Sequence, residues 1–275
     1  MRRRTRPRYR SVILLALSLA ALMAFAPTVL AANIDDLVLS LEQGDRTQKL
    51  KAIRQLGALG DVKALRPLLN ALQDRSDDLI REEAARALGQ IGDKRAVLLL
   101  VTRLKEERVA IVRARIAEAL GKLKDLRSVG ALIKATDDSE LRWIRLYAAW
   151  SLGEIRDGRA IAPLLNMSLT GEHTFVHNEA KIALLKSVDI WSKIEQGDIV
   201  LAYGSIEARD RIKSLKQFLI DMLTDPNERI RLMAVKALGK YADAESAEYL
   251  RRTAERDNSS KIRKAAQAAL VKRGF

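Results

Sequence analysis

The stretch REEAARALGQIGDKRAVLLL, residues 81–100, holds the pattern that decides the fold of this chain. Small residues at Ala84 and Ala87 come just before the pair Leu88-Gly89, and Asp93 follows it. Apolar residues three and four positions apart on both sides of this aspartate are typical of amphipathic helices, and aspartate is a favoured residue at a helix start. The stretch therefore predicts a hairpin of two short helices, the second beginning at the aspartate.

The same pattern recurs along the chain at a fixed spacing. The leucine of the pair recurs every 32 residues from Leu56 to Leu184 and then appears twice more, so its positions are Leu56, Leu88, Leu120, Leu152, Leu184, Leu238 and Leu270. A hairpin of two short helices cannot bury its apolar face alone, so successive hairpins must stack on one another. We expect an all-α fold, an α-solenoid with a period of 32 residues, over residues 32–275.

Two further columns of residues follow the same period. Small residues that would let neighbouring helices approach closely stand at Ala52, Ala84, Ala148, Ala180, Ala234 and Ala266, and at Ala87, Ala119, Ser151, Ala183, Ala237 and Ala269. Aspartates that would start the second helix of each hairpin stand at Asp61, Asp93, Asp125, Asp157, Asp189 and Asp243.

The copy that runs from Arg81 to Gly89, with Asp93 and Arg95-Ala96 after it, resembles the HEAT-like repeats found in phycobilin lyase subunits. The resemblance covers nearly the whole chain from about Asn33. It implies a HEAT-repeat solenoid of helical hairpins. It implies little about activity, because repeat folds host many unrelated tasks.

The N-terminus predicts export. Residues 1–10 carry six arginines and no acid, an apolar core runs from Val12 to Ala26, and Val29-Leu30-Ala31 ends the segment with a small residue. This order is typical of a secretory signal peptide, here residues 1–31, which would leave a periplasmic or secreted protein. The alternative is an uncleaved membrane anchor over residues 12–32, which would also place the rest of the chain outside the cytoplasm.

Composition limits the chemistry. The chain has no cysteine, which excludes disulfides, thiol catalysis and a lipid-modified cysteine. Loss of residues 1–31 would remove six of the 49 basic residues and none of the 35 acidic ones, which leaves a net charge of +8. Charges of both signs are interspersed, which favours a solvated basic surface over a dedicated nucleic-acid site.

Both histidines, His173 and His177, lie in the stretch GEHTFVHNEA, residues 171–180, among acids that could help hold a metal. His177, however, belongs to a basic column that precedes each repeat leucine, namely Lys49, Arg81, Arg113, Arg145, His177, Arg231 and Arg263. Acids stand earlier in several copies, at Asp74, Glu106 and Asp138, so we expect this column to bond to the turns between repeats. Deoxyhypusine hydroxylase, a HEAT-repeat di-iron enzyme, uses several His-Glu pairs, and this chain has no His-Glu dipeptide. We therefore expect no metal and no cofactor.

The period is broken once. Leu184 and Leu238 are 54 residues apart, and the extra residues form an insertion at about residues 190–209. Insertions in solenoids often lie on the binding face, although a loop without a partner is the alternative. Trp191 and Tyr203 stand outside the repeat positions and are the candidates for an apolar surface patch, whereas we expect Trp150 to be buried.

A second basic column, Lys63, Arg95, Arg127 and Arg159, follows each cap aspartate by two residues. A cation in the first turn of a helix opposes the helix dipole, so its repetition needs a reason. One reading pairs each cation with an acid of its own or an adjacent repeat. The other places the column along one edge of the concave face, where it meets an acidic partner while Trp191 and Tyr203 supply the apolar anchor.

The sequence contains no nucleotide-binding loop, nucleophile elbow or zinc signature. We therefore predict a noncatalytic protein-binding scaffold outside the cytoplasm that uses its concave face and the 190–209 insertion. The alternatives are a phycobilin-lyase-like or other HEAT-repeat enzyme, and a binder of nucleic acid or an anionic envelope polymer. Membrane association is expected only if the N-terminal segment stays as an anchor.

Overall fold

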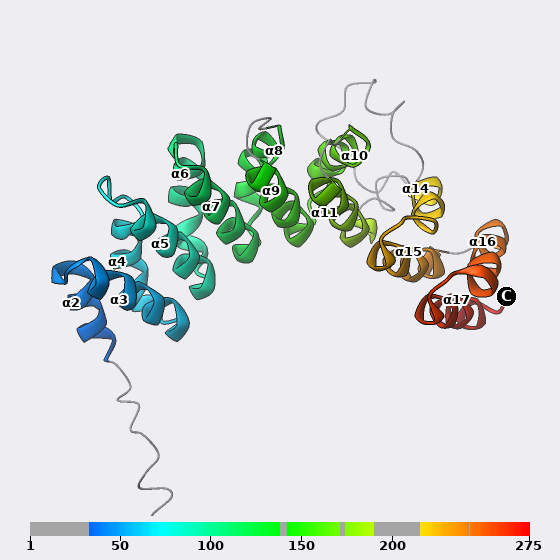
Figure 1. Cartoon of the computed structure of the whole chain (residues 1–275), viewed down its shortest axis with the longest axis horizontal. Coiled ribbons are helices and arrows are strands. Elements are labelled where there is room, and N and C mark those ends of the chain that lie inside the picture. Colours follow the sequence, from blue (N-terminus) through cyan, green and yellow to red (C-terminus); the bar gives the residue numbers. More distant parts are fainter. Residues whose placement is uncertain (1–32, 138–141, 171–173, 190–214, 242) are drawn as a thin grey trace, which may run out of the picture.

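The computed structural model describes residues 33–137, 142–170, 174–189, 215–241 and 243–275. Helices and the turns between them make up these ranges, so the predicted all-α fold is confirmed. Figure 1 shows the hairpins stacked side by side into an arch. The predicted signal peptide and the 190–209 insertion, with Trp191 and Tyr203, lie outside the described residues.

The inner curve of the arch is formed by the helices that carry the repeat leucine (Figure 1). These inner helices are α3 (Arg46–Leu59), α5 (Asp78–Ile91), α7 (Ala110–Leu123), α9 (Arg142–Ile155), α11 (Thr174–Lys186), α15 (Glu228–Tyr241) and α17 (Ser260–Arg273). The outer helices are α2 (Ile34–Gln43), α4 (Leu65–Ala71), α6 (Val97–Glu106), α8 (Val129–Thr136), α10 (Ile161–Thr170), α14 (Leu215–Met222) and α16 (Ala244–Arg256).

Inner helices touch one another through the glycine of the Leu-Gly pair. A Cβ atom added to Gly89 of α5 would lie 2.9 Å from the Ala119 Cα of α7, and one added to Gly153 of α9 would lie 2.8 Å from the Ala183 Cα of α11. Real Cβ atoms do not approach that closely, so these positions require glycine opposite a small residue. The small column that includes Ala119 and Ala183 is thereby confirmed as a helix contact.

Four of the cap aspartates lie at the start of a short 3₁₀ turn that precedes the outer helix, and not at the start of the outer helix itself. Asp61, Asp93, Asp125 and Asp157 each accept a backbone hydrogen bond at the start of a 3₁₀ turn rather than of an α-helix. These turns, η1 (Val62–Ala64), η2 (Lys94–Ala96), η3 (Leu126–Ser128) and η4 (Gly158–Ala160), lead directly into the outer helices. A 3₁₀ turn at this point tightens the reversal between two helices of the same hairpin.

The two later aspartates differ from these four. Asp243 caps α16 directly and accepts a bond from the Ser246 backbone. Asp189 is itself helical, contrary to its predicted role as a cap, and its carboxylate pairs with Lys240 of α15.

The core is a continuous row of leucines between the inner and outer helices. Leu68, Leu100, Leu132 and Leu164 hold the same position in four outer helices and are all fully buried, as are the repeat leucines opposite them. Within the ranges that the structure describes, no helix is both long enough and apolar enough to cross a membrane.

Candidate protein-binding surface

An apolar row runs along the inner curve of the arch at the first turn of four neighbouring helices. Its members are Leu79 of α5, Ile111 of α7, Trp143 of α9 and Phe175 of α11, all at the same repeat position. Leu79 is half-buried, whereas Ile111 is 47% exposed, Trp143 55% and Phe175 79%. Single exposed apolar residues are ordinary on a protein surface, but a row on consecutive helices is typical of an interaction site. We call these four residues the apolar row.

Helix α9 widens this row into an aromatic face. Trp143, Tyr147 and Trp150 lie four and three residues apart, so they share one side of the helix. Trp150 is half-buried rather than buried as expected: its ring reaches α7, where a Cβ added to Gly121 would lie 2.7 Å from the Trp150 Cζ3. The Lys186 Nζ lies 5.9 Å from the Trp150 ring centroid, within cation–π range.

Acids pair with several inner-face cations from α3 to α11. Glu83 accepts hydrogen bonds from Arg54 at 2.9 Å and from Arg86 at 2.7 Å, and so joins α3 to α5. Arg115 of α7 pairs with Glu82 of α5 at 3.1 Å and with Glu118 of its own helix at 2.6 Å. The pairs of Arg54 with Glu83 and of Arg115 with Glu82 join adjacent inner helices. The other two pairs, of Arg86 with Glu83 and of Arg115 with Glu118, lie within one helix.

The same arrangement continues to α11. Glu154 of α9 binds Lys186 of α11 at 2.8 Å and Lys124, which ends α7, at 2.9 Å. Hydrogen bonds from these two lysines lower the pKa of Glu154 in spite of the opposing effect of burial. This part of the inner face therefore carries little uncompensated charge.

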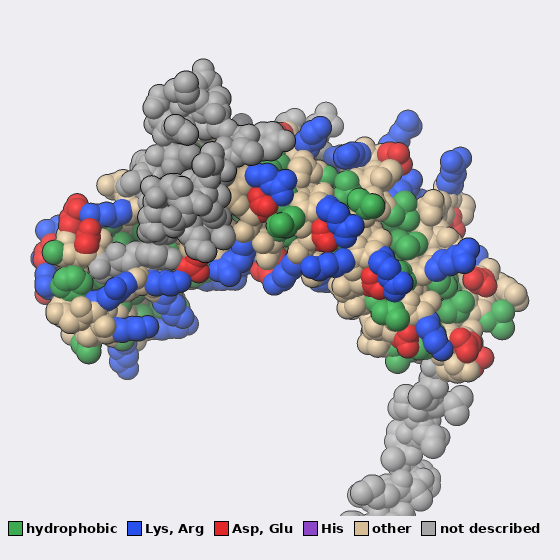
Figure 2. All heavy atoms as spheres, turned by 180° about the vertical axis from the view of Figure 1, so that it is seen from behind, with side chains coloured by type: hydrophobic (Ala, Val, Ile, Leu, Met, Phe, Trp, Pro, Cys, Tyr) green, Lys and Arg blue, Asp and Glu red, His purple; other side chains and the backbone are tan. Residues whose placement is uncertain are grey.

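The inner face of α15 and α17 is different. Arg229 and Lys236 of α15 and Lys261, Lys264 and Lys272 of α17 are exposed, and none of these five side chains forms an ion pair with a described residue. Helix α17 contains no acidic residue. Figure 2 shows basic side chains projecting from the inner side of the arch near its C-terminal end. We call these five residues the basic cluster.

The predicted bonds between the basic column and the turns are confirmed at Arg81, Arg231 and Arg263. Arg81 donates to the Asp74 carbonyl at 3.0 Å, and its guanidinium also makes two bonds, of 2.8 and 3.1 Å, to the Glu107 carboxylate of the next repeat. The acid partner is thus Glu107, while Asp74 takes part through its backbone. Arg231 repeats the arrangement with Asp257 at 2.8 Å and the Asp225 carbonyl at 2.9 Å.

His177 occupies the arginine position in α11, where the arrangement changes. Lys181, one turn later, donates to Asp225 at 2.6 Å and so makes the bond to the next repeat. Burial lowers the pKa of His177, and the Lys181 charge lowers it further against the opposing effect of Asp225. The His177 Nδ1 is buried without a hydrogen-bond partner.

The described residues around His177 do not form a metal site. Across the described ranges, no group of three or more histidine, aspartate or glutamate residues is placed to hold a metal ion. His173 lies outside those ranges. The absence of a metal therefore stays a prediction.

The second basic column bonds within the protein at three of its four positions. Arg95 pairs with Asp93 at 2.6 Å, Arg127 with Asp125 at 2.8 Å and Arg159 with Asp157 at 2.8 Å. The bond from Arg127 lowers the pKa of Asp125 to about 2.

Two of these arginines also join successive turns. Arg127 donates to the Lys94 carbonyl at 3.1 Å, and Arg159 donates to the Leu126 carbonyl at 3.2 Å. For Lys63 it is the backbone amide that bonds to the cap, Asp61. The geometry favours the structural reading of this column, and a role for Lys63, Arg95, Arg127 and Arg159 in binding a partner stays a prediction.

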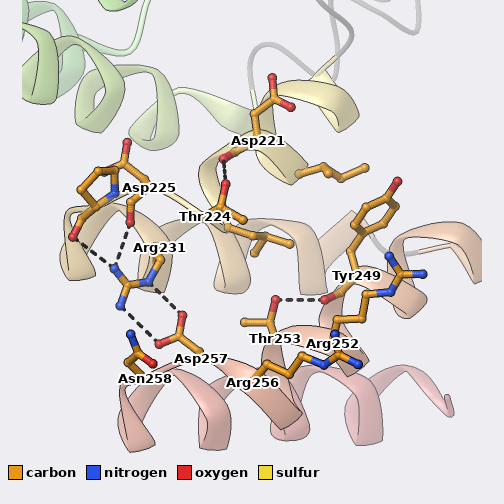
Figure 3. Close-up of a pocket in the computed structure, with 13 residues that line it drawn as sticks. Asp221, Thr224, Asp225, Arg231, Tyr249, Arg252, Thr253, Arg256, Asp257 and Asn258 are labelled. Atoms are coloured by element: carbon orange, nitrogen blue, oxygen red, sulfur yellow. Dashed lines mark hydrogen bonds and ion pairs between the residues drawn. The ribbon is translucent and has the colours of Figure 1, made fainter.

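A cavity of about 740 Å³ lies between α14, α15 and α16 (Figure 3). The Arg231 and Asp257 pair closes one side, and Tyr249, Arg252 and Arg256 of α16 line the other (Figure 3). None of its lining residues is a histidine, serine or cysteine, so the cavity offers no such nucleophile or imidazole base.

Comparison with known proteins agrees with this architecture. The profile of the HEAT repeats matches residues 34–121, 100–185 and 196–271. The chain belongs to the HEAT repeat family. No protein of curated function matches the sequence.

Three solved structures are similar to this HEAT repeat protein. The phycocyanin lyase complex of CpcE and CpcF from Nostoc sp. PCC7120 has 22% identity and a TM-score of 0.54, with 88% of each chain covered. YibA from Escherichia coli has 19% identity and a TM-score of 0.53, with 96% of this chain and 87% of that chain covered. A HEAT-like repeats protein from Thermococcus onnurineus has 16% identity and a TM-score of 0.52, with 86% and 95% covered. Likeness at this level shows a shared fold.

Proposed function

We propose that this HEAT repeat protein is a noncatalytic scaffold that receives a protein partner on the inner face of its arch. The observation that carries the proposal is the apolar row of Leu79, Ile111, Trp143 and Phe175. The repeat leucines already fill the core, so the fold does not require the exposed side chains of Ile111, Trp143 and Phe175. Aromatic side chains are enriched where protein interfaces gain most of their binding energy. An extended inner surface is the usual binding site of solenoids.

Three carboxylates of the inner face support a noncatalytic role. The carboxylates Glu83, Glu118 and Glu154 each bond to basic side chains on the same face. A general acid or base needs a free lone pair or proton near the substrate, and ion-paired acids do not offer one.

We also propose that the protein works outside the cytoplasm. The arginine-rich start, the apolar core from Val12 to Ala26 and the Val29-Leu30-Ala31 site support export. N-terminal sequencing of the protein recovered from cell fractions tests this. A chain that starts near Ala32 in the periplasm or medium supports it, and a chain that retains Met1 in the cytosol contradicts it.

Site-specific photocrosslinking in living cells tests the scaffold proposal. A photoreactive phenylalanine analogue would replace Trp143 or Phe175 of the apolar row. In matched controls it would replace Leu98 of α6 or Leu169 of α10, which are 61% and 59% exposed on outer helices. We expect one discrete protein adduct from the two inner positions and none from the controls. Adducts of equal yield from inner and outer positions, or none from the inner ones, would overturn the proposal.

A further inference from the structure

We propose that the partner is a protein segment in which an apolar anchor stands next to an acidic stretch, bound lengthwise along the inner face. This inference rests on the proposed function and names the chemistry of the partner. The anchor would contact the apolar row on α9 and α11, and the acidic stretch would contact the basic cluster on α15 and α17.

The apolar row and the basic cluster lie on consecutive inner helices. The repeat position that holds Trp143 and Phe175 continues on the next two inner helices with Arg229 and Lys261. The Lys181 and Asp225 bond, at 2.6 Å, shows that α11 meets the start of the next repeat in spite of the insertion between them. The apolar row and the basic cluster are therefore successive parts of one surface.

The positive charge of the basic cluster is complementary to an acidic partner. The four exposed lysines of the basic cluster form no ion pair with a described acid, and Arg229 acts on Glu179 only through its charge. Arg54, Arg86 and Arg115 on the preceding helices are all ion-paired. Uncompensated like charges repel one another, and an acidic partner removes that repulsion as it binds. Arg229 and Lys236 on one helix and Lys261 and Lys264 on the next could engage several carboxylates together.

The length of the inner face from α9 to α17 sets the length of the bound segment. Neighbouring packed helices lie about 8–10 Å apart, so the four helices from α9 to α17 offer a surface on the order of 30 Å long. An extended protein segment of about ten residues spans that length. An anchor of two or three apolar residues followed by an acidic stretch fits these dimensions.

A protein segment suits this surface better than a nucleic acid does. A polyanion would have to pass Glu83, Glu118 and Glu154 if it followed the inner face beyond α11. Leu79 and Ile111 of the apolar row are aliphatic and offer bases no stacking surface. A polypeptide can place acidic residues next to an apolar anchor, whereas a nucleic acid carries its negative charge along its whole backbone.

Fluorescence anisotropy with labelled peptides tests the inference. The probe is a peptide of about 16 residues with a Leu-Phe-Leu anchor at one end and a run of glutamates at the other, and a second probe has the reverse order. A third has glutamines in place of the glutamates. We expect one of the two acidic probes to bind the full chain, and the glutamine peptide to bind about tenfold more weakly.

Two pairs of variants locate the binding. The reversal Lys236→Glu with Lys261→Glu should weaken binding about tenfold or more and flatten its salt dependence between about 50 and about 300 mM. Its matched control is Lys105→Glu with Lys134→Glu, two exposed lysines of outer helices α6 and α8. Trp143→Ala with Phe175→Ala should also weaken binding, with Leu98→Ala and Leu169→Ala as the control. Lys236→Gln with Lys261→Gln, a milder change, covers the case in which the reversal disturbs folding.

Several results would overturn the inference. Unchanged peptide binding after the reversal at Lys236 and Lys261 is one. Another is tighter binding of single-stranded DNA of about 20 nucleotides than of either acidic peptide, lost on that reversal. A third is binding of vesicles of three parts phosphatidylcholine to one part phosphatidylglycerol in place of the peptides. If the adduct at Trp143 persists in cells after the reversal, the scaffold function stands and the acidic partner does not.

Discussion

The repeats before and after the insertion share their packing and differ in their inner surface. Gly89 lies against Ala119 before it, and Gly239 lies against Ala269 after it; an added Cβ would lie 3.0 and 2.6 Å from the respective alanine Cβ atoms. Before the insertion Arg54, Arg86 and Arg115 are bonded to acids, whereas after it Lys236, Lys261 and Lys264 form no ion pair with a described residue. Stacking contacts recur because every hairpin must bury the same face, while inner-face positions vary because no neighbour constrains them. A solenoid can therefore change its partner without changing its fold.

The first way to break this comparison is to remove the arginine that joins one repeat to the next. Arg81 and Glu107 are almost fully buried, so Arg81→Ala leaves a buried carboxylate without its main partner, which costs about 3–5 kcal/mol. Arg231 and Asp257 are more exposed, and we expect a smaller loss from Arg231→Ala. Urea unfolding of both variants checks the order, with the exposed Arg66→Ala as control. Equal losses in the free energy of unfolding would mean that the repeats before and after the insertion depend on this bond to the same degree.

The second way is to crowd the contact between inner helices. A Cβ at Gly89 would lie 3.0 Å from that of Ala119, so Gly89→Ala must push α5 and α7 apart at a cost of about 1–3 kcal/mol. Gly239→Ala should cost a similar amount, because its added Cβ would lie 2.6 Å from the Ala269 Cβ. Gly130 of α8 has no atom within 4 Å of its added Cβ, so Gly130→Ala should instead stabilise by about 0.5–1 kcal/mol. Thermal unfolding gives all three values, and a stabilising Gly89→Ala would contradict this account of the stacking.

The third test uses two inner-face glutamates whose pKa values move in opposite directions. Burial alone would raise the pKa of Glu118, but hydrogen bonds from Lys122 and Arg115 outweigh burial and lower it. Burial raises the pKa of Glu179 in α11, against the weaker effects of Lys186 and Arg229, and its Oε1 has no hydrogen-bond partner. Ionised Glu118 therefore stabilises the fold above pH 4.5, its ordinary value, and this contribution is lost as the pH falls through the lowered pKa. Glu179 contributes in the opposite sense, so stability falls as the pH rises through its raised pKa.

Substitution of Glu118 or Glu179 by glutamine should show that the two ionised carboxylates affect stability in opposite directions. At about pH 7.5 we expect Glu118→Gln to lower the melting temperature and Glu179→Gln to raise it. At about pH 4 the effect of Glu179→Gln should nearly vanish, because the acid is then protonated in both states. A drop in melting temperature from Glu179→Gln at neutral pH would show that this carboxylate is ionised and paired.

The smallest expected effect sharpens the division between packing and surface. Ile111 and Phe175 are exposed, so Ile111→Ser and Phe175→Ser should each change the free energy of unfolding by no more than about 0.5 kcal/mol. The buried neighbour Ile144 supplies the contrast, because Ile144→Ala should cost about 2–5 kcal/mol. Chemical denaturation measures all three. A large loss from Phe175→Ser would place that ring in the core and remove the basis of the apolar row.

Comparison of the copies in the sequence predicts the repeat, the hairpins, the small residues between helices and the bonds of Arg81, Arg231 and Arg263 to the turns. Each of these depends on a pattern that returns with the period, so a linear comparison of copies finds it. The apolar row was also open to that comparison, through the position shared by Leu79, Ile111, Trp143 and Phe175, but its exposure was not.

The tertiary structure alone decided which side chains face the inner curve and which charges meet there. Arg81 bonds to Glu107 rather than to its neighbour Glu106, and Lys181 replaces His177 in reaching Asp225 across the insertion. Such partners come from different hairpins. Their distance depends on how the helices stack and turn, which no spacing along one chain specifies.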